Sequence, residues 1–114
     1  VCDLLHTHTV MIASKAALAD PFKKAKIDQI ALLLTAALTA RHKVLLKMNA
    51  PVAALDKIVA VLPALNAPTV NHLSDENWVA VETVVDRQEV RELIPKLRAS
   101  GAEGILELDI QKIC

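Results

Sequence analysis

The sequence predicts an α+β fold in which an antiparallel sheet carries both of its helices on one face. From residue 43 onward, strand-like and helix-like patterns follow one another in the order β-α-β-β-α-β, which is the order of the ferredoxin-like unit. Each of these segments has its own start or stop signal. The chain has 114 residues and is 54% hydrophobic, which is enough for one domain with a substantial core.

A short strand and a long helix are expected ahead of this unit. The run "TVMIAS", residues 9–14, is β-branched and apolar and predicts a strand. In the following "ADPFKKAKIDQIALLLTAALTARHK", Asp20 is a natural N-cap and Pro21 occupies the first helical position, where its missing N–H is harmless. Between Ile27 and Leu38 this helix is apolar nearly all round, which predicts burial on several sides and therefore a subunit interface.

The first half of the unit combines a strand with a helix. "KVLLKMN", residues 43–49, predicts the strand. Pro51 then opens a helix that ends near Pro63 and places four apolar residues on one face: Val52, Leu55, Ile58 and Leu62.

The second half begins with a hairpin. "PTVNHL" and "WVAVETVV" flank the turn-forming "SDEN", which predicts two strands joined by four to five residues. Asp86 and Glu89 form a capping-box pattern at the start of a helix, and Gly101 stands where a C-terminal cap glycine belongs. "GILELDI", residues 104–110, predicts the last strand.

Composition excludes several classes of partner. Thirteen basic and thirteen acidic residues give a net charge of zero, and Phe22 and Trp78 are the only aromatic residues, so we expect no nucleic-acid partner. The most lipophilic run is too short for a bilayer, so we expect a soluble, cytoplasmic protein without a membrane partner. Cys2 and Cys114 indicate free thiols in a reducing cytosol, with a terminal disulfide as the alternative. Because the chain begins at Val1, we expect it to derive from a longer protein.

Groups that could carry catalysis are few. Carboxylates are spread over solvent-facing helix positions, and the only glycines, Gly101 and Gly104, do not form a phosphate-binding loop. We therefore expect neither catalytic residues nor a cofactor. "HTH" is the one metal-like pattern: on a strand His6 and His8 would point the same way and could reach one ion. Two ligands do not complete a site, and the alternative is a pair of exposed polar residues.

Three residues remain as candidates for ligand binding. Asn49 ends the first strand of the unit, where an Asx turn or a helix-entry cap is the local alternative. Thr69 begins the second strand and can equally be an ordinary β-branched strand residue. Gly104 can be a permissive strand start or a bulge. Strand ends in this fold lie near shared edges, so the three can converge.

A family resemblance rests on two long stretches. "KMNAPVAALDKIVAVLPALNAPTVNHLSDENWVAVETVV" and "LIPKLRASGAEGILELDIQKI" resemble the C-terminal regulatory domain of long-form ATP phosphoribosyltransferase, the enzyme that starts histidine biosynthesis. The resemblance implies an ACT-like ferredoxin fold that binds L-histidine as a feedback inhibitor between neighbouring regulatory domains. It places Asn49, Thr69, Val84 and Gly104 at histidine contacts. Full-length members are dimers that form hexamers and use magnesium with ATP and phosphoribosyl pyrophosphate.

The upstream segment resembles the end of the same family's catalytic region. Residues 1–42 are interpreted as a remnant of that region with its connecting helix, and residues 43–114 as the regulatory domain. The family grips the sugar donor with a Thr/Gly-rich loop, whereas His8 stands where that loop needs a small residue. The resemblance therefore implies a chain that binds L-histidine and has no turnover of its own.

Two other functions stay open. The all-round apolar helix is also compatible with an engineered or degenerate oligomeric ferredoxin-like scaffold that binds no ligand. The pair His6 and His8 is compatible with a metal-binding ferredoxin-like protein. In each case we expect self-association through the helix between Ile27 and Leu38 and through the sheet edges.

Overall fold

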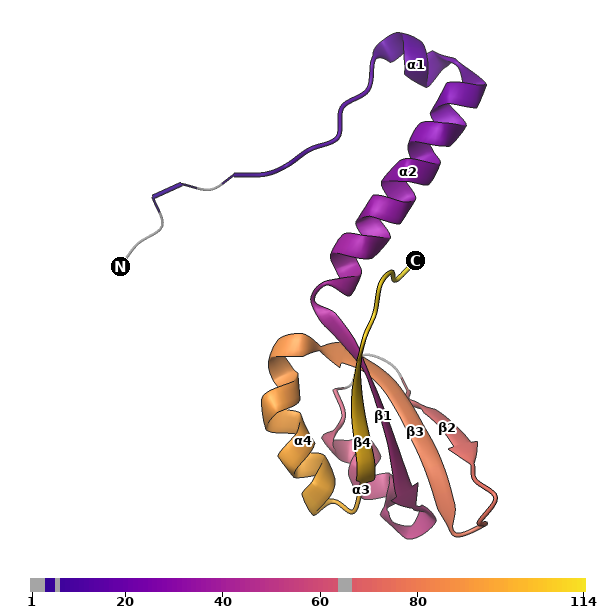
Figure 1. Cartoon of the computed structure of the whole chain (residues 1–114), viewed down its shortest axis with the longest axis vertical. Helices are drawn as coiled ribbons and strands as arrows, with labels where there is room; N and C mark the ends of the chain where they lie inside the picture. Colours follow the sequence, from indigo (N-terminus) through magenta and orange to yellow (C-terminus); the bar gives the residue numbers. More distant parts are fainter. Residues whose placement is uncertain (1–3, 6, 64–66) are drawn as a thin grey trace.

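The computed structural model describes residues 4, 5, 7–63 and 67–114 of the chain (Figure 1). Its helices, 3-10 turns and strands follow in the order α1 (Lys15–Ala19), α2 (Pro21–Ala40), β1 (Lys43–Pro51), η1 (Val52–Ala54), α3 (Leu55–Val61), β2 (Thr69–His72), β3 (Trp78–Asp86), η2 (Arg87–Glu89), α4 (Val90–Ala99) and β4 (Glu103–Asp109).

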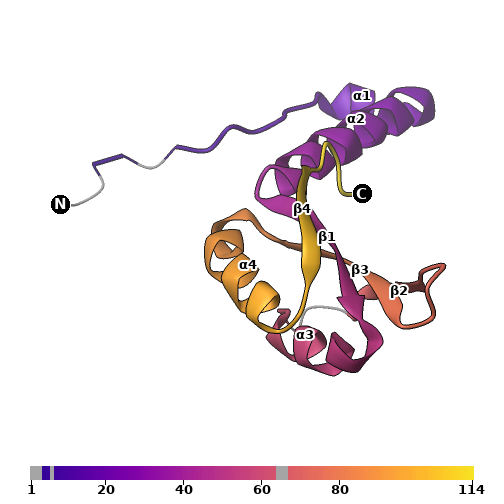
Figure 2. The same ribbon diagram turned by 60° about the horizontal axis from the view of Figure 1, so that its bottom comes forward.

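The strands form one sheet in the order β2-β3-β1-β4, and every neighbouring pair is antiparallel. This is the strand order of a split βαβ unit, so the predicted ferredoxin-like architecture is confirmed. Helices α3 and α4 lie on the same face of the sheet (Figure 2). Burial on β1 alternates because successive side chains point to opposite faces. The core lies between the sheet and the two helices and contains Val44, Leu46, Met48, Ala50, Ile58, Leu62, Val79, Val81, Val85, Val90, Leu93, Leu97 and Ala102.

The predicted strand at residues 9–14 is wrong. In the described part of the chain no strand pairs with this segment, whose residues are all exposed. An isolated extended run cannot satisfy its backbone groups in a ladder, so β propensity alone does not make it a strand. Instead Ser14 caps the short helix α1, its Oγ accepting from the Ala17 N–H at 3.1 Å.

The long helix α2 begins as predicted. The Asp20 carboxylate accepts from the backbone N–H groups of Phe22 and Lys23, and Pro21 is the first helical residue. Only Ala36 and Ala40 are buried in α2, whereas six of its large apolar side chains are exposed: Phe22, Ile30, Leu32, Leu33, Leu34 and Leu38. No helix of the described residues, α2 included, is long and apolar enough to cross a membrane.

Helix α2 projects from the sheet domain (Figure 1). The Cα radius of gyration is 20.0 Å, against about 13 Å for a compact chain of this length. A groove of about 830 Å³ runs between α2 and residues 9–11, and Leu34 and Leu38 line it. The apolar faces of α2 are thus left uncovered by the described chain itself.

The capping box predicted at Asp86 and Glu89 is wrong. Asp86 makes no side-chain cap bond; a 3-10 turn follows it, and α4 begins only at Val90. The reason lies in the strand register, which places Asp86 opposite Lys43, so that the carboxylate is held by the Lys43 ammonium. By contrast, Gly101 directly follows the C-cap of α4 with φ +108°, as the cap prediction requires.

Arg87 fixes the end of α2 to the sheet. Its backbone N–H donates to the His42 carbonyl at 2.8 Å, and its Nε donates to the Arg41 carbonyl at 3.3 Å. Its guanidinium also pairs with the Asp109 carboxylate on β4 at 3.0 Å. On the C-terminal side, the Ile113 N–H donates to the Ala36 carbonyl at 3.1 Å. These contacts join α2, β3 and β4 at one corner of the domain.

Candidate functional site

The face of the sheet opposite α3 and α4 carries three of the four candidate ligand residues, Asn49, Thr69 and Val84. On β1 the residues that alternate with the buried ones point to this face, and Lys47 and Asn49 are exposed there. The register places Glu82 and Ala80 of β3 beside them, followed by Thr69 and Asn71 of β2. Directly paired residues of antiparallel strands share a face, so these side chains form rows across the sheet.

Thr69 and Val84 line one hollow. This hollow measures about 240 Å³ and lies where β2 begins beside β3; the described residues around it are Leu45, Pro63, Ala67, Thr69, Glu82, Thr83 and Val84. Thr69 supplies a hydroxyl and Val84, 47% exposed, an apolar wall. The structure therefore brings together two of the four predicted residues.

Asn49 and Gly104 form the second pair, on β1 and β4. Asn49 lies opposite Glu103, next to a register shift that leaves one extra residue on β4. Gly104 occupies that bulge with φ +58°, the left-handed conformation that such a bulge favours in glycine. Asn49 lies inside β1, two residues before its end, instead of ending the strand as predicted, so neither the Asx turn nor the helix cap applies.

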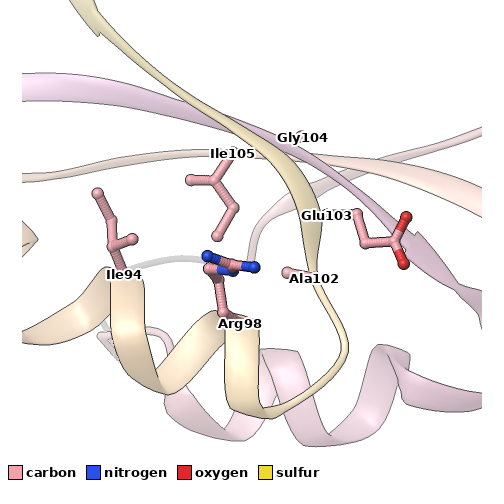
Figure 3. A pocket seen from close by; sticks show the side chains of 6 residues that line it. All are labelled: Ile94, Arg98, Ala102, Glu103, Gly104 and Ile105. Atoms are coloured by element: carbon pink, nitrogen blue, oxygen red, sulfur yellow. The ribbon is translucent and has the colours of Figure 1, made fainter.

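Gly104 borders a different cavity from Thr69. This cavity, about 330 Å³, lies between α4 and the start of β4, with the Arg98 guanidinium reaching into it from the helix (Figure 3). A Cβ built on Gly104 would meet no atom of the described chain within 4 Å. A side chain at this position would thus meet only a ligand or another chain.

The two pairs do not converge within one chain. Thr69 lies two strands and two residues away from Asn49, which places their Cα atoms roughly 12 Å apart. Lys47 and Glu82 occupy the sheet between them. The expectation that the candidates surround a single pocket is therefore not met by one copy of the domain.

The ion pair between Lys47 and Glu82 was not identified from the sequence. The Lys47 Nζ lies 3.2 Å from Glu82 Oε1, and the side chains are 48% and 30% exposed. Both residues are ordinary charged residues in alternating strands, and only the β1–β3 register makes them partners. Counting inward from the hairpin and pairing its second strand with the first strand of the unit could have revealed the pair.

The structure does not place His8 on a strand, as the predicted metal pattern required. His6 lies outside the described residues, and His8 lies in an exposed segment that is not a strand, so the alternation argument does not apply. No group of three His, Cys, Asp or Glu side chains in the described part of the chain could hold a metal ion. Cys114 is an exposed free thiol, and Cys2 lies outside the described residues.

Comparison with known proteins decides the family. Residues 40–112 match the family model described as "HisG, C-terminal domain". The chain belongs to the HisG C-terminal domain family. The resemblance read from the motifs is thereby confirmed, together with the ferredoxin-like, ACT-like fold of this HisG domain.

Two similar proteins carry the same name. The chain is 53% identical over 113 residues to the ATP phosphoribosyltransferase of Geotalea uraniireducens, and this match covers 99% of the chain and 39% of that protein. Over 111 residues it is 56% identical to the enzyme of Desulfosudis oleivorans, covering 97% of the chain and 38% of that protein. The HisG-related chain therefore spans less than two-fifths of the length of these relatives.

Proposed function

We propose that this chain is the regulatory L-histidine-binding module of an ATP phosphoribosyltransferase, the enzyme of the first step of histidine biosynthesis. It binds the end product and carries no catalytic residues of its own. We assign it no cofactor, because magnesium belongs with the ATP and sugar donor of the catalytic part. A cytoplasmic location follows from the pathway.

The observation that carries this proposal is the hollow lined by Thr69 and Val84. It offers a hydroxyl, a carboxylate and an apolar wall within about 240 Å³. The carboxylate can pair with the ammonium of a zwitterionic amino acid, the hydroxyl can bond a further polar group, and the apolar wall can contact the carbons of its side chain. The relatives at 53% and 56% identity, both named ATP phosphoribosyltransferase, support histidine as the amino acid.

The division into two residue pairs favours a site between neighbouring copies. Thr69 and Val84 lie towards the β2 side of the sheet, and Asn49 and Gly104 lie towards β4. A ligand held by the first pair of one copy reaches the second pair most directly on an adjacent copy. Self-association through the sheet edges would provide that arrangement. Because Gly104 has no side chain, a neighbouring backbone could approach it closely.

Removing the hydroxyl of Thr69 tests the site. We expect Thr69→Val to weaken L-histidine binding by about 1 kcal/mol, because it keeps the side-chain shape and removes one donor and acceptor. Asn49→Ala is expected to weaken binding by a similar amount. The measurement is calorimetric titration of each variant with L-histidine. Thr39→Val is the matched control: this threonine lies on α2, where its hydroxyl bonds the Thr35 carbonyl. Unchanged affinity in both Thr69→Val and Asn49→Ala would place the pocket elsewhere.

Phosphoribosyl transfer by this chain is not expected. The donor loop implied by the family is replaced by "LLHTHTV", which contains no glycine, and the chain spans 39% of its relative from Geotalea uraniireducens. The purified chain is incubated with ATP, phosphoribosyl pyrophosphate and magnesium, with a full-length relative assayed in parallel. Product formed by the chain alone, at a rate above the enzyme-free background, would contradict this expectation.

Two other functions remain as alternatives. The exposed apolar residues of α2 favour an oligomeric scaffold without a ligand. Such a scaffold would give no heat of binding with L-histidine in the titration described above. The metal-binding alternative rests on His6 and His8, and a zinc titration of the same sample would detect it.

A further inference from the structure

We propose that Glu82 binds the ammonium group of the amino acid in the Thr69–Val84 hollow, while Lys47 binds its carboxylate. This inference rests on the proposed function and adds to it the residues that recognise the two charges. Among the four residues placed by family resemblance, none carries a charge.

The geometry places Glu82 in the lining of the hollow and its ion-pair partner Lys47 one strand away. Lys47, Glu82 and Thr69 are direct neighbours on three adjacent strands, because Glu82 is the register partner of both other residues. Lys47 Nζ lies 3.2 Å from Glu82 Oε1, and Glu82 also lines the hollow. A ligand seated beside Thr69 therefore lies next to a carboxylate whose own counter-ion is one strand away.

Glu82 is the only charged residue among the described residues that line this hollow. The amide of Asn49 can accept a hydrogen bond from an ammonium group but cannot neutralise its charge. The other carboxylates in ion pairs lie elsewhere: Asp28 on α2, and Asp86 and Asp109 at the corner fixed by Arg87. Among the described residues around the hollow, Glu82 is thus the carboxylate that an ammonium group beside Thr69 can meet.

The charge balance explains why a zwitterion fits. Before binding, the Lys47–Glu82 pair is neutral as a unit; the ligand is also neutral overall. Exchange of partners, with the ammonium on Glu82 and the carboxylate on Lys47, turns one ion pair into two without burying a net charge. A ligand that carries only one of the two charges would pair with either Lys47 or Glu82. The other residue of the ion pair would then lose its counter-ion.

The experiment combines variants with truncated ligands. L-histidine is compared with 3-(imidazol-4-yl)propionate, which lacks the ammonium, and with histamine, which lacks the carboxylate. We expect Glu82→Gln to weaken L-histidine binding about tenfold and to change imidazolylpropionate binding by less than about twofold. Lys47→Met is expected to weaken L-histidine binding about tenfold and to leave histamine binding within about twofold.

Asp109→Asn is the matched control, because it removes a carboxylate from another ion pair, the one between Arg87 of η2 and Asp109 of β4 at the corner of the sheet. L-histidine binding by Glu82→Gln at the affinity of the control would overturn this inference, even while Thr69→Val still weakens binding and the proposed function stands. No L-histidine binding by the unmodified chain would instead overturn the proposed function itself. The unmodified chain gives a second test that needs no variant: equal affinity for L-histidine and imidazolylpropionate would also exclude Glu82 as the ammonium partner.

Discussion

Replacing Leu46 with alanine is expected to lower the free energy of unfolding by about 3 kcal/mol. Leu46 is fully buried in the centre of β1 and packs in the core formed by the sheet, α3 and α4. Truncation removes the transfer free energy of the lost carbons and leaves a cavity that the neighbouring strands cannot fill completely. Since small domains are typically stable by only about 5–15 kcal/mol, this one change takes a large share of the total.

The measurement is chemical denaturation at one fixed protein concentration, with the slope compared between variants. Leu106→Ala is the matched control, because Leu106 is the β4 register neighbour of Lys47 and is 54% exposed on the helix-free face. We expect the control to lose less than about 1 kcal/mol. Equal losses in both variants would mean that the core does not lie between the sheet and the helices.

Self-association is the second large effect. The exposed apolar residues of α2 lie on several sides of the helix, and an uncovered apolar surface of this kind is unusual in a soluble monomer. Light scattering at tens of micromolar is expected to give at least twice the 12.3 kDa mass of one chain. Leu34 and Leu38 stand one turn apart and line the groove beside residues 9–11. The double variant Leu34→Lys/Leu38→Lys should therefore reduce the mass towards that of one chain.

The control for this variant adds the same charge without removing apolar surface. Gln29→Lys together with Gln88→Lys changes two exposed polar residues, one on α2 and one in η2. This variant should keep the mass of the unmodified chain. A single-chain mass for the unmodified protein would remove the basis for assigning α2 to an interface.

Much of the fold could be predicted because its signals are local. Asp20 with Pro21 starts α2, and Gly101 ends α4, each through the backbone geometry of a few neighbouring residues. The predictions at residues 9–14 and at Asp86 were wrong because distant residues decide both. The first segment lacks a strand beside it, and the carboxylate of Asp86 is taken by Lys43, which is 43 residues away in the chain.

The candidate site was predicted less completely than the fold. Family resemblance supplied Asn49, Thr69, Val84 and Gly104, but their separation into two pairs depends on the strand order and the bulge in β4. Glu82 was not singled out, because its partner Lys47 becomes a neighbour only once the β1–β3 register has been worked out. Residue types alone carry no information about which strands lie side by side.

The contacts of Arg87 couple one end of α2 to the sheet. The Arg41 and His42 carbonyls both accept hydrogen bonds from Arg87, and these bonds tie the base of the helix to the end of β3. The helix has 20 residues and is therefore about 30 Å long. A rotation of the sheet by about 10° would carry the distant end of α2 through roughly 5 Å, which is close to one helical turn. A small reorientation of the sheet would thus become a displacement of several ångströms at the Pro21 end of α2.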